Sequence, residues 1–365
     1  MRSPRYQAVA DTALVVMFAS ALLAPLVGMW LGIGQLQASE EKRQLAPLPR
    51  ITPDFRSWDT VPPAFTAYFN DHFGFRETLV LDHAAFLVRV LGESTTPDVL
   101  VGKQGWLYYA HGRTMDSYRG LESFHPGELD QWVTALRRMR DWLASRKIPF
   151  YVIIPPDKHT IYPEYLPSSV TLSATTRLDT LLAALREAKV DVIDIRDDLR
   201  RAKSAGPLYY LTDTHWNGDA GYVAYRAILL EIGRTFPRVH PYPKSDFKYS
   251  RRKATGDLNA MLGLTHGYEE ELLFLVPKSD SSVRPEVGNL VINVHNDPQL
   301  PRMVMLRDSF ATFLMTLLSQ NFSRAAYLWD NNFNAALIQS EKPDLVLFEL
   351  VERRLADGAP LEPSP

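Results

Sequence analysis

The fold is decided by residues 303–318, which run MVMLRDSFATFLMTLL. The first four residues form an apolar run short enough for a buried strand, whereas Phe310 to Leu318 is an apolar run that suits a helix. Ser309 therefore lies between a strand and a helix, and in a sheet of parallel strands ligands bind at such junctions. We expect the free backbone N–H groups of the helix start to serve an oxyanion there.

The rest of the chain repeats this alternation of helices and short apolar strands. Amphipathic spacing predicts helices over residues 129–143, 176–189 and 218–236, the last capped by Asn217 or Asp219. Apolar runs predict strands at residues 150–154, 190–195, 303–306 and 344–350. The pattern predicts an α/β fold with a mainly parallel sheet flanked by helices on both faces.

The N-terminus carries a longer apolar run. Residues 12–34 contain no charged side chain, and a helix of this length spans about 34 Å, enough for a bilayer core of about 30 Å. Arg2 and Arg5 precede the run, so the positive-inside tendency places the N-terminus in the cytoplasm. We predict a single-pass signal anchor in a bacterial inner membrane with the rest of the chain in the periplasm. The alternative is a signal peptide cleaved near Ser39, although its apolar region is normally about 7 to 15 residues.

These patterns divide the chain into segments. Residues 1–34 form the cytoplasmic stub and transmembrane anchor, and residues 35–97 form a linker, rich in proline up to residue 63, with an amphipathic helical segment after it. Residues 98–356 form the α/β domain, and residues 357–365 are expected to be a disordered tail.

Composition excludes several classes of function. The formal net charge of the 365 residues is -2, which gives no bulk attraction for nucleic acid. The chain has no cysteine, so disulfides, thiolate metal sites and a cysteine nucleophile are excluded. We predict no cofactor and no metal, because neither a phosphate-binding glycine loop nor a metal-ligand spacing is present. His111, His159 and His266 are expected on the surface or in loops.

The chemistry is carried by Asp213-Thr-His-Trp216 together with Ser309. A serine hydroxyl becomes a good nucleophile when a histidine takes its proton and a carboxylate orients that histidine. An extended backbone would place Asp213 and His215 on the same side of the chain. Taken alone, each motif also fits a purely structural role. In that interpretation Asp213 caps the helix that follows it, and Ser309 caps the helix that begins near Phe310.

Several further motifs occur in order, and together they resemble the SGNH-hydrolase-like polysaccharide O-acetyltransferases of the alginate acetylation type (AlgJ/AlgX-like). The motifs are Asp71-His-Phe-Gly-Phe-Arg76, Gly105-Trp-Leu-Tyr-Tyr109, Pro155-Pro-Asp-Lys-His-Thr-Ile-Tyr-Pro-Glu164, Asp213-Thr-His-Trp216, Gly256-Asp-Leu258, Arg307-Asp-Ser-Phe310 and Lys342 to Arg353. The resemblance implies that Asp213, His215 and Ser309 form the catalytic triad. This order resembles a circular permutation of the ordinary SGNH fold, in which serine comes first.

The sequence also offers candidates for substrate binding. Arg307 stands where ordinary SGNH hydrolases have glycine, and we expect it to bind an anionic group or to pair with Asp308. Trp216 is predicted to stack on a sugar ring, with core packing as the alternative. Lys158 follows a strand end and is expected either to face the site or to lie in a solvated loop. Residues 100–130 and 236–300 are expected to shape the acceptor groove, because long connections carry specificity.

The resemblance implies an enzyme that transfers acetyl to hydroxyls of an exopolysaccharide through an acyl-serine intermediate. It further implies a membrane-bound O-acyltransferase-type partner that supplies the acetyl group. A carbohydrate acetylesterase with the same Ser-His-Asp site is the first alternative, because transfer differs from hydrolysis only in how well the site excludes water. A non-catalytic polysaccharide-binding scaffold of an export or acetylation complex is the second.

Overall fold

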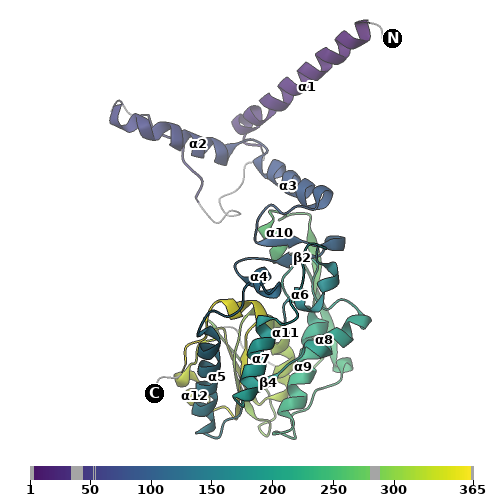
Figure 1. Ribbon diagram of the computed structural model, residues 1–365. Coiled ribbons are helices and arrows are strands. Elements are labelled where there is room, and N and C mark those ends of the chain that lie inside the picture. Colours follow the sequence, from purple (N-terminus) through teal and green to yellow (C-terminus); the bar gives the residue numbers. More distant parts are fainter. Residues whose placement is uncertain (1–3, 34–43, 52, 54, 280–287, 363–365) are drawn as a thin grey trace. The chain divides into compact units, whose positions relative to one another are not determined.

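The computed structural model describes residues 4–33, 44–51, 53, 55–279 and 288–362, and the chain forms two compact units, Met1–Leu91 and Gly92–Pro365 (Figure 1). Residues 35–43 of the linker segment predicted for 35–97, and residues 363–365 at the end of the predicted tail, lie outside the described residues. The second unit begins at Gly92 rather than at residue 98. The residues between already pack onto it, since the Thr95 hydroxyl donates to the Leu262 carbonyl at 3.0 Å.

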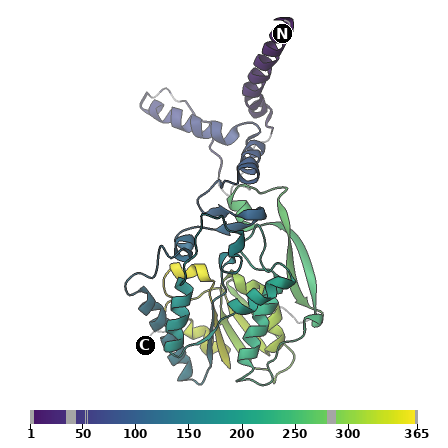
Figure 2. The same ribbon diagram turned by 45° about the vertical axis from the view of Figure 1, so that its right-hand side comes forward.

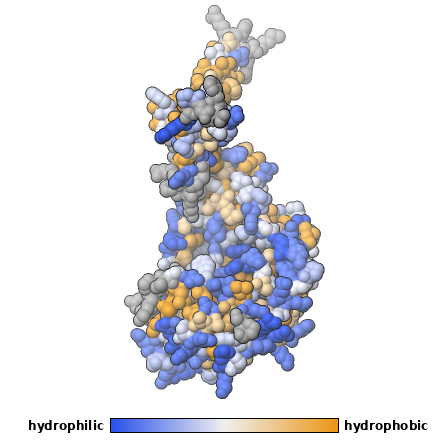
Figure 3. Space-filling model, turned by 90° about the vertical axis from the view of Figure 1, so that its left-hand side faces the viewer, coloured by the Kyte–Doolittle hydropathy of each residue, from blue (hydrophilic) through white to orange (hydrophobic). Residues whose placement is uncertain are grey.

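The first unit consists of helices. α1 (Pro4–Leu31) includes the stretch Ala8–Leu31, whose mean hydropathy is 2.2 and whose length suffices to cross a membrane. Only 6% of its most apolar window is buried, so α1 is not the core helix of a globular unit; Figure 3 shows apolar side chains along it in orange. The helix ends before the predicted residue 34, because Gly32 turns the backbone with a φ of 68°. The remaining elements are η1 (Phe55–Thr60), α2 (Val61–His72), α3 (Arg76–Phe86) and the π-helical turn η2 (Leu87–Leu91).

The second unit is built on a six-stranded sheet with the order β4-β3-β10-β8-β9-β7. All neighbouring strands are parallel except β7, which pairs antiparallel with β9. The strands are β3 (Phe150–Ile153), β4 (Asp191–Ile193), β7 (Leu290–Val294), β8 (Arg302–Leu306), β9 (Arg324–Leu328) and β10 (Leu345–Glu349). The prediction of a mainly parallel sheet is therefore confirmed.

Helices bury both faces of this sheet (Figure 2). Met303 and Met305 of β8 belong to one hydrophobic cluster with side chains of α9 (Gly218–Ile232) and α11 (Thr312–Leu318). The alternate residues Val304 and Leu306 belong to a second cluster with α5 (Glu128–Ala144) and α7 (Arg177–Glu187). Burial on both faces explains why these strands are continuous apolar runs rather than alternating ones.

The second unit also contains shorter elements. They are β1 (Val99–Val101), β2 (Leu107–Tyr109), α4 (Thr114–Tyr118), α6 (Lys158–Ile161), α8 (Arg196–Ala202), β5 (Phe247–Thr255), α10 (Asp257–Met261), β6 (Glu269–Pro277) and α12 (Ala335–Glu341). β1 with β2 and β5 with β6 form antiparallel pairs that the sequence analysis did not predict. The helix predicted over residues 218–236 ends at Ile232, and its N-cap is Asn217 rather than Asp219.

Candidate active site

Ser309 lies at the strand-to-helix turn that the sequence predicted. β8 ends at Leu306, and the 3-10 helix η7 (Ser309–Ala311) leads directly into α11. Asp308 holds this turn, since its Oδ1 accepts the Phe310 N–H at 2.9 Å and its Oδ2 accepts the Val351 N–H at 2.7 Å. The N–H of Phe310, one of the helix-start groups predicted to serve an oxyanion, is therefore used within the turn.

The segment with Asp213 and His215 is a bend rather than the extended chain that the sequence predicted. Asp213 Oδ1 accepts the backbone N–H of His215 at 2.9 Å and lies 2.7 Å from the ring Nδ1. On the other side of the ring, Nε2 lies 2.8 Å from Ser309 Oγ. The three residues thus form one hydrogen-bonded chain, and Asp213 does not cap α9, whose cap is Asn217.

The environment of Asp213 keeps its carboxylate charged. Burial raises a carboxyl pKa, but the hydrogen bond and charge of His215, together with the backbone N–H groups of His215 and Asp257, lower the pKa of Asp213 to about 2. An ionised Asp213 favours the imidazole tautomer with its proton on Nδ1. Nε2 is then an acceptor for the Ser309 hydroxyl proton.

Two carboxylates from later segments hold the bend in place. Glu270 of β6 accepts the backbone N–H groups of residues 211–212, each at 3.0 Å. Asp257, the first residue of α10, accepts the Thr214 N–H at 2.7 Å and donates its own N–H to Asp213 Oδ2 at 3.0 Å. Sequence reasoning did not assign roles to Asp257 and Glu270, because each acts on residues more than 40 positions earlier in the chain.

Gly256 allows α10 to approach the bend closely. A Cβ at this position would lie 2.2 Å from the Thr212 carbonyl oxygen, which is closer than non-bonded atoms can approach. The N–H groups of Leu258 and Asn259 donate to that same oxygen at 3.1 and 3.2 Å. The glycine is therefore required by the close contact between α10 and the bend.

Replacing Gly256 by alanine is expected to push α10 away from the bend and to misplace Asp257. Misplacement of a catalytic group by about 1 Å costs up to roughly 100-fold in rate, so we expect kcat on a small acetyl ester to fall about 10- to 100-fold. Steady-state kinetics of this variant, beside the neighbouring Thr255→Ala control, measure the effect. A wild-type kcat for Gly256→Ala would contradict the role of this contact.

Two of the three predicted substrate-binding residues are buried in the core beside the triad. Trp216 is 0% exposed, and its indole N–H donates to the Phe310 carbonyl at 2.9 Å. The prediction that it stacks on sugar is wrong, because neither ring face is open. Arg307 is 1% exposed; its Nη1 donates to the Asp308 carbonyl at 3.3 Å, and its guanidinium lies 4.1 Å from the ring centroid of Trp329. The prediction that Arg307 binds an anionic substrate directly is wrong, because its guanidinium is buried.

Lys158, the third, is 3% exposed and neither faces the site nor lies in a solvated loop. Its Nζ donates to the carbonyl of Leu107 at 2.7 Å and to that of Leu211 at 3.1 Å. It therefore ties β2 to the bend that carries His215. Burial lowers the pKa of Lys158 to about 7, although the nearby carboxylates of Glu270 and Asp213 oppose the shift.

The depressed pKa of Lys158 makes a prediction about stability. Its folded pKa, about 7, lies below the lysine value in an unfolded chain, so the unfolded state binds more protons between these values. We therefore expect the free energy of unfolding to rise with pH above about 7. Urea unfolding from pH 7 to pH 9.5 checks this, and Lys158→Met should flatten the rise. An equal slope in both proteins would contradict it.

A buried carboxyl group contacts the turn that carries Ser309. Glu349, at the end of β10, is 0% exposed, and its Oε2 accepts the Asp308 N–H at 2.9 Å. Burial and then the charge of Asp308 raise the pKa of Glu349 well above its usual range. Glu349 therefore supports the turn through the Asp308 N–H, a long-range contact that no local sequence pattern predicts.

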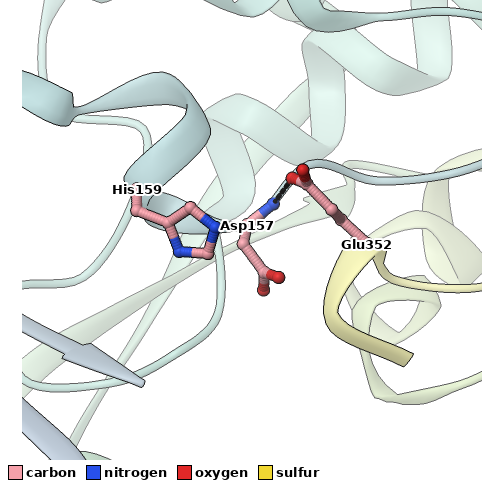
Figure 4. A group of neighbouring side chains, drawn as sticks. All are labelled: Asp157, His159 and Glu352. Atoms are coloured by element: carbon pink, nitrogen blue, oxygen red, sulfur yellow. Dashed lines mark hydrogen bonds between the residues drawn. The ribbon is translucent and has the colours of Figure 1, made fainter. Parts of the chain in front are cut away.

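In the described part of the chain, two groups of side chains bring metal-ligand atoms within 4.8 Å of one another. One is Asp213, His215 and Asp257, where Nδ1 of the histidine is already bonded to Asp213. The other is Asp157, His159 and Glu352, and Figure 4 shows Glu352 accepting the backbone N–H of Asp157.

The second group is an ion-paired cluster of the core. Asp157 Oδ1 lies 2.8 Å from Nη1 of Arg353, and Thr160 donates to Glu352 at 2.6 Å. A guanidinium this close balances the carboxylate and repels a divalent cation. His159 is 3% exposed, so its predicted place on the surface is wrong, and burial lowers the pKa of His159 to about 4. The donors fit a structural cluster better than a metal centre.

Comparison with known families and curated proteins shows which family the chain matches. The family model described as "SGNH hydrolase-like domain, acetyltransferase AlgX" matches residues 99–284, half of the chain. The chain is 25% identical over 297 residues to the probable alginate O-acetylase AlgJ of Pseudomonas aeruginosa, a match that covers 78% of this chain and 69% of that protein. It is 24% identical over 298 residues to the protein of the same description from Azotobacter vinelandii, with the same coverage of 78% and 69%.

Solved structures show the same fold. The structure of Bacillus cereus PatB1 matches with a TM-score of 0.56 at 18% identity, covering 70% of this chain and 96% of that one. The O-acetyltransferase domain of Pseudomonas putida AlgJ matches with a TM-score of 0.50 at 19% identity, covering 71% and 92%. At these identities the likeness establishes the fold alone, and it confirms the predicted SGNH-like class.

Proposed function

The chain belongs to the SGNH hydrolase-like acetyltransferase family of the AlgX type, and we propose that it transfers acetyl groups through an acyl-serine intermediate on Ser309. The observation that carries the proposal is the hydrogen-bonded chain from Asp213 through His215 to Ser309, with steps of 2.7 and 2.8 Å. These distances allow direct proton transfer between the hydroxyl and the imidazole. The family match supports acetyl as the group that is transferred, and the hydrogen-bonded chain supports Ser309 as the nucleophile.

In the first half-reaction Ser309 Oγ attacks the carbonyl carbon of an acetyl ester while His215 Nε2 takes the hydroxyl proton. The ester C–O bond then breaks, and the imidazolium returns this proton to the leaving alkoxide. Asp213 keeps the ring oriented and stabilises its charged form. The products are acetyl-Ser309 and the free alcohol of the donor.

In the second half-reaction an acceptor hydroxyl gives its proton to His215 and attacks the acetyl carbon. The bond from Ser309 Oγ to this carbon breaks, and the serine oxygen recovers the proton from the imidazolium. We propose a polysaccharide hydroxyl as acceptor, because curated relatives of this chain are described as probable alginate O-acetylases.

The assay is a transfer reaction with the full chain in detergent. An acetyl-ester donor is incubated with alginate or cellulose oligosaccharides, and mass spectrometry detects acetylated sugar. We expect acetylated oligosaccharide from at least one acceptor. Acetate release without acetylated sugar at any acceptor concentration would contradict transfer.

Hydrolysis is the second candidate, because 22% of the His215 side chain is exposed and water can reach the base. In a carbohydrate acetylesterase water would replace the sugar hydroxyl in the second half-reaction. The two functions share every residue of the triad. Their ratio is set by how fully a bound acceptor excludes water from the acyl-serine.

We propose that α1 is retained as a single-pass inner-membrane anchor and that residues 92–362 lie in the periplasm. α1 packs against the turn between α2 and α3: a Cβ on Gly74 would lie 2.3 Å from the Pro25 carbonyl, and the Phe75 N–H donates to Ile33 at 3.1 Å. A signal peptide that is cleaved off would not need to pack this closely against the turn between α2 and α3. The mass of the protein extracted from membranes tests this, and a mature chain starting near Ser39 would overturn it.

We further propose that the acetyl group is supplied by a membrane-bound O-acyltransferase-type partner. An anchored enzyme shares the plane of the membrane with such a partner, which raises the frequency of their encounters. Crosslinking of the full chain in membranes, followed by identification of the captured protein, tests the proposal. Capture of no multi-spanning membrane protein would contradict it.

A further inference from the structure

Trp329 is an exposed aromatic side chain at the carboxyl end of strand β9, next to the strand that leads to Ser309. It directly follows β9, and 47% of its side-chain surface is exposed. In the described part of the second unit the other tryptophans are buried or half-buried: Trp106, Trp132, Trp142 and Trp216. Exposing an indole ring to water costs free energy, so an exposed tryptophan near a reactive serine calls for a physical explanation.

The strand register brings Trp329 close to Ser309. Leu306 of β8 pairs with Leu328 of β9, and the Arg307 N–H donates to the Leu328 carbonyl at 2.9 Å, so Trp329 follows beside Arg307. Adjacent strands are about 4.8 Å apart and two residues of chain span at most about 7 Å, so the α-carbons of Trp329 and Ser309 lie within about 12 Å. This is a separation that one oligosaccharide can bridge.

Arg307 and Trp329 also lie on the same side of the sheet, the side that packs next to the triad. Met305 and Tyr327 are paired, and both belong to the hydrophobic cluster that contains Phe310 and Trp216, next to the triad. Alternation along the strands directs the residue two positions further to the same face. The contact between the Arg307 guanidinium and the Trp329 ring agrees with this direction.

One face of the Trp329 ring is covered by Arg307, while 47% of the residue's surface remains exposed. Arg307, 1% exposed, lies with its guanidinium 4.1 Å from the ring centroid, so one face of the indole is covered by a buried cation. The backbone is held as well, since the Trp329 N–H donates to the Asn289 carbonyl at 2.7 Å. A ring held in this way loses little conformational entropy when a ligand binds to its free face.

We infer that Trp329 is the platform on which the acceptor sugar stacks while its hydroxyl approaches acetyl-Ser309. Pyranose rings present an apolar face of C–H groups, and a fixed aromatic face that is open to solvent binds this surface. Arg307 acts through the indole as a positioning residue. The inference rests on the proposed function and names the binding subsite for its carbohydrate acceptor.

The test separates acceptor binding from acylation. Trp329→Ala in the full chain should raise the KM for an oligosaccharide acceptor roughly tenfold or more, while the rate of Ser309 acetylation by a small ester stays within about twofold of wild type. Trp329→Phe should recover most of the affinity. Trp58→Ala is the matched control, since Trp58 is 51% exposed but belongs to the other compact unit.

Calorimetric titration with unacetylated alginate and cellulose oligosaccharides gives a readout that does not depend on chemistry. We expect binding to the wild type that Trp329→Ala weakens roughly tenfold. Equal affinities in the two proteins, or no binding of any of these sugars to the wild type, would overturn the inference. If the wild type binds sugar through Trp329 but Ser309 is never acetylated, the proposed function is overturned and the sugar-binding inference is not.

Discussion

Replacing Ser309 by alanine is expected to abolish acetyl-enzyme formation and to lower transfer by about 10³- to 10⁶-fold. Ser309 Oγ lies 2.8 Å from His215 Nε2, so its removal ends the hydrogen-bonded chain that starts at Asp213 before it reaches a nucleophile. The turn itself should survive, because it is held by Asp308 through the N–H groups of Phe310 and Val351. The loss therefore measures chemistry and not folding.

The measurement is transfer of acetyl from an ester donor, together with thermal unfolding of each protein. Ser340→Ala is the matched control, since Ser340 lies in α12, is exposed and donates only to the Leu337 carbonyl within its own helix. We expect wild-type transfer in the control and equal unfolding temperatures in both variants. Transfer by Ser309→Ala within tenfold of wild type, or unchanged polymer acetylation in cells, would favour a non-catalytic scaffold.

Replacing Asp213 by asparagine is expected to lower kcat by roughly 10⁴-fold while the fold is kept. The amide is nearly isosteric, but it carries no charge to stabilise the imidazolium and can present an N–H to Nδ1, which selects the wrong tautomer. The neighbouring carboxylate of Asp257 lies 3.7 Å from Nδ1, too far for a hydrogen bond, so it does not replace Asp213.

Asp257→Asn is the matched comparison for this variant. Asp257 acts on the bend through the Thr214 N–H and through its own backbone, so we expect a loss of about tenfold rather than 10⁴-fold. Stopped-flow acylation by a chromogenic acetyl ester gives both rates. Equal losses in Asp213→Asn and Asp257→Asn would contradict the assignment of Asp213 as the residue that orients His215.

The pKa of Asp213 adds a pH dependence to the same pair of proteins. Its folded pKa of about 2 lies below the ordinary aspartate value near 4, so its ionised form stabilises the folded state above about pH 4. This contribution is lost as the pH falls from about 4 to about 2. The stability difference between wild type and Asp213→Asn should therefore shrink over this window.

The strands and the main helices could be predicted because the spacing of apolar residues within each segment determines them. Val304 and Leu306 alternate with Met303 and Met305, and all four are buried, so an uninterrupted apolar run predicts the strand. The same run followed by Arg307, Asp308 and Ser309 also predicts the turn at the end of the strand. The ends of the predicted strands and helices of the second unit shift by up to four residues, and the end of α1 by three, because caps such as Asn217 and turns such as Gly32 decide them.

The burial of side chains beside the site does not follow from local sequence. Lys158 is polar and stands next to prolines, yet carbonyls of Leu107 and Leu211, about 50 positions away on either side, make a buried ammonium possible. Trp216 and Trp329 are equally apolar, but tertiary packing covers the first and leaves the second open. Sequence alone therefore singled out Asp213, His215 and Ser309, which the structure brings together, but it could not decide between stacking on sugar and core packing for Trp216.

We expect Ser309 to carry the acetyl group between donor and acceptor. The most direct measurement is peptide mass spectrometry of the full chain, quenched after incubation with an acetyl-ester donor and again after addition of an oligosaccharide. We predict one acetyl group on the peptide that contains Ser309, and its loss when acetylated sugar appears. Acetylated sugar formed while Ser309 stays unmodified at every time point, or an acetyl group that remains on another residue, would contradict the claim.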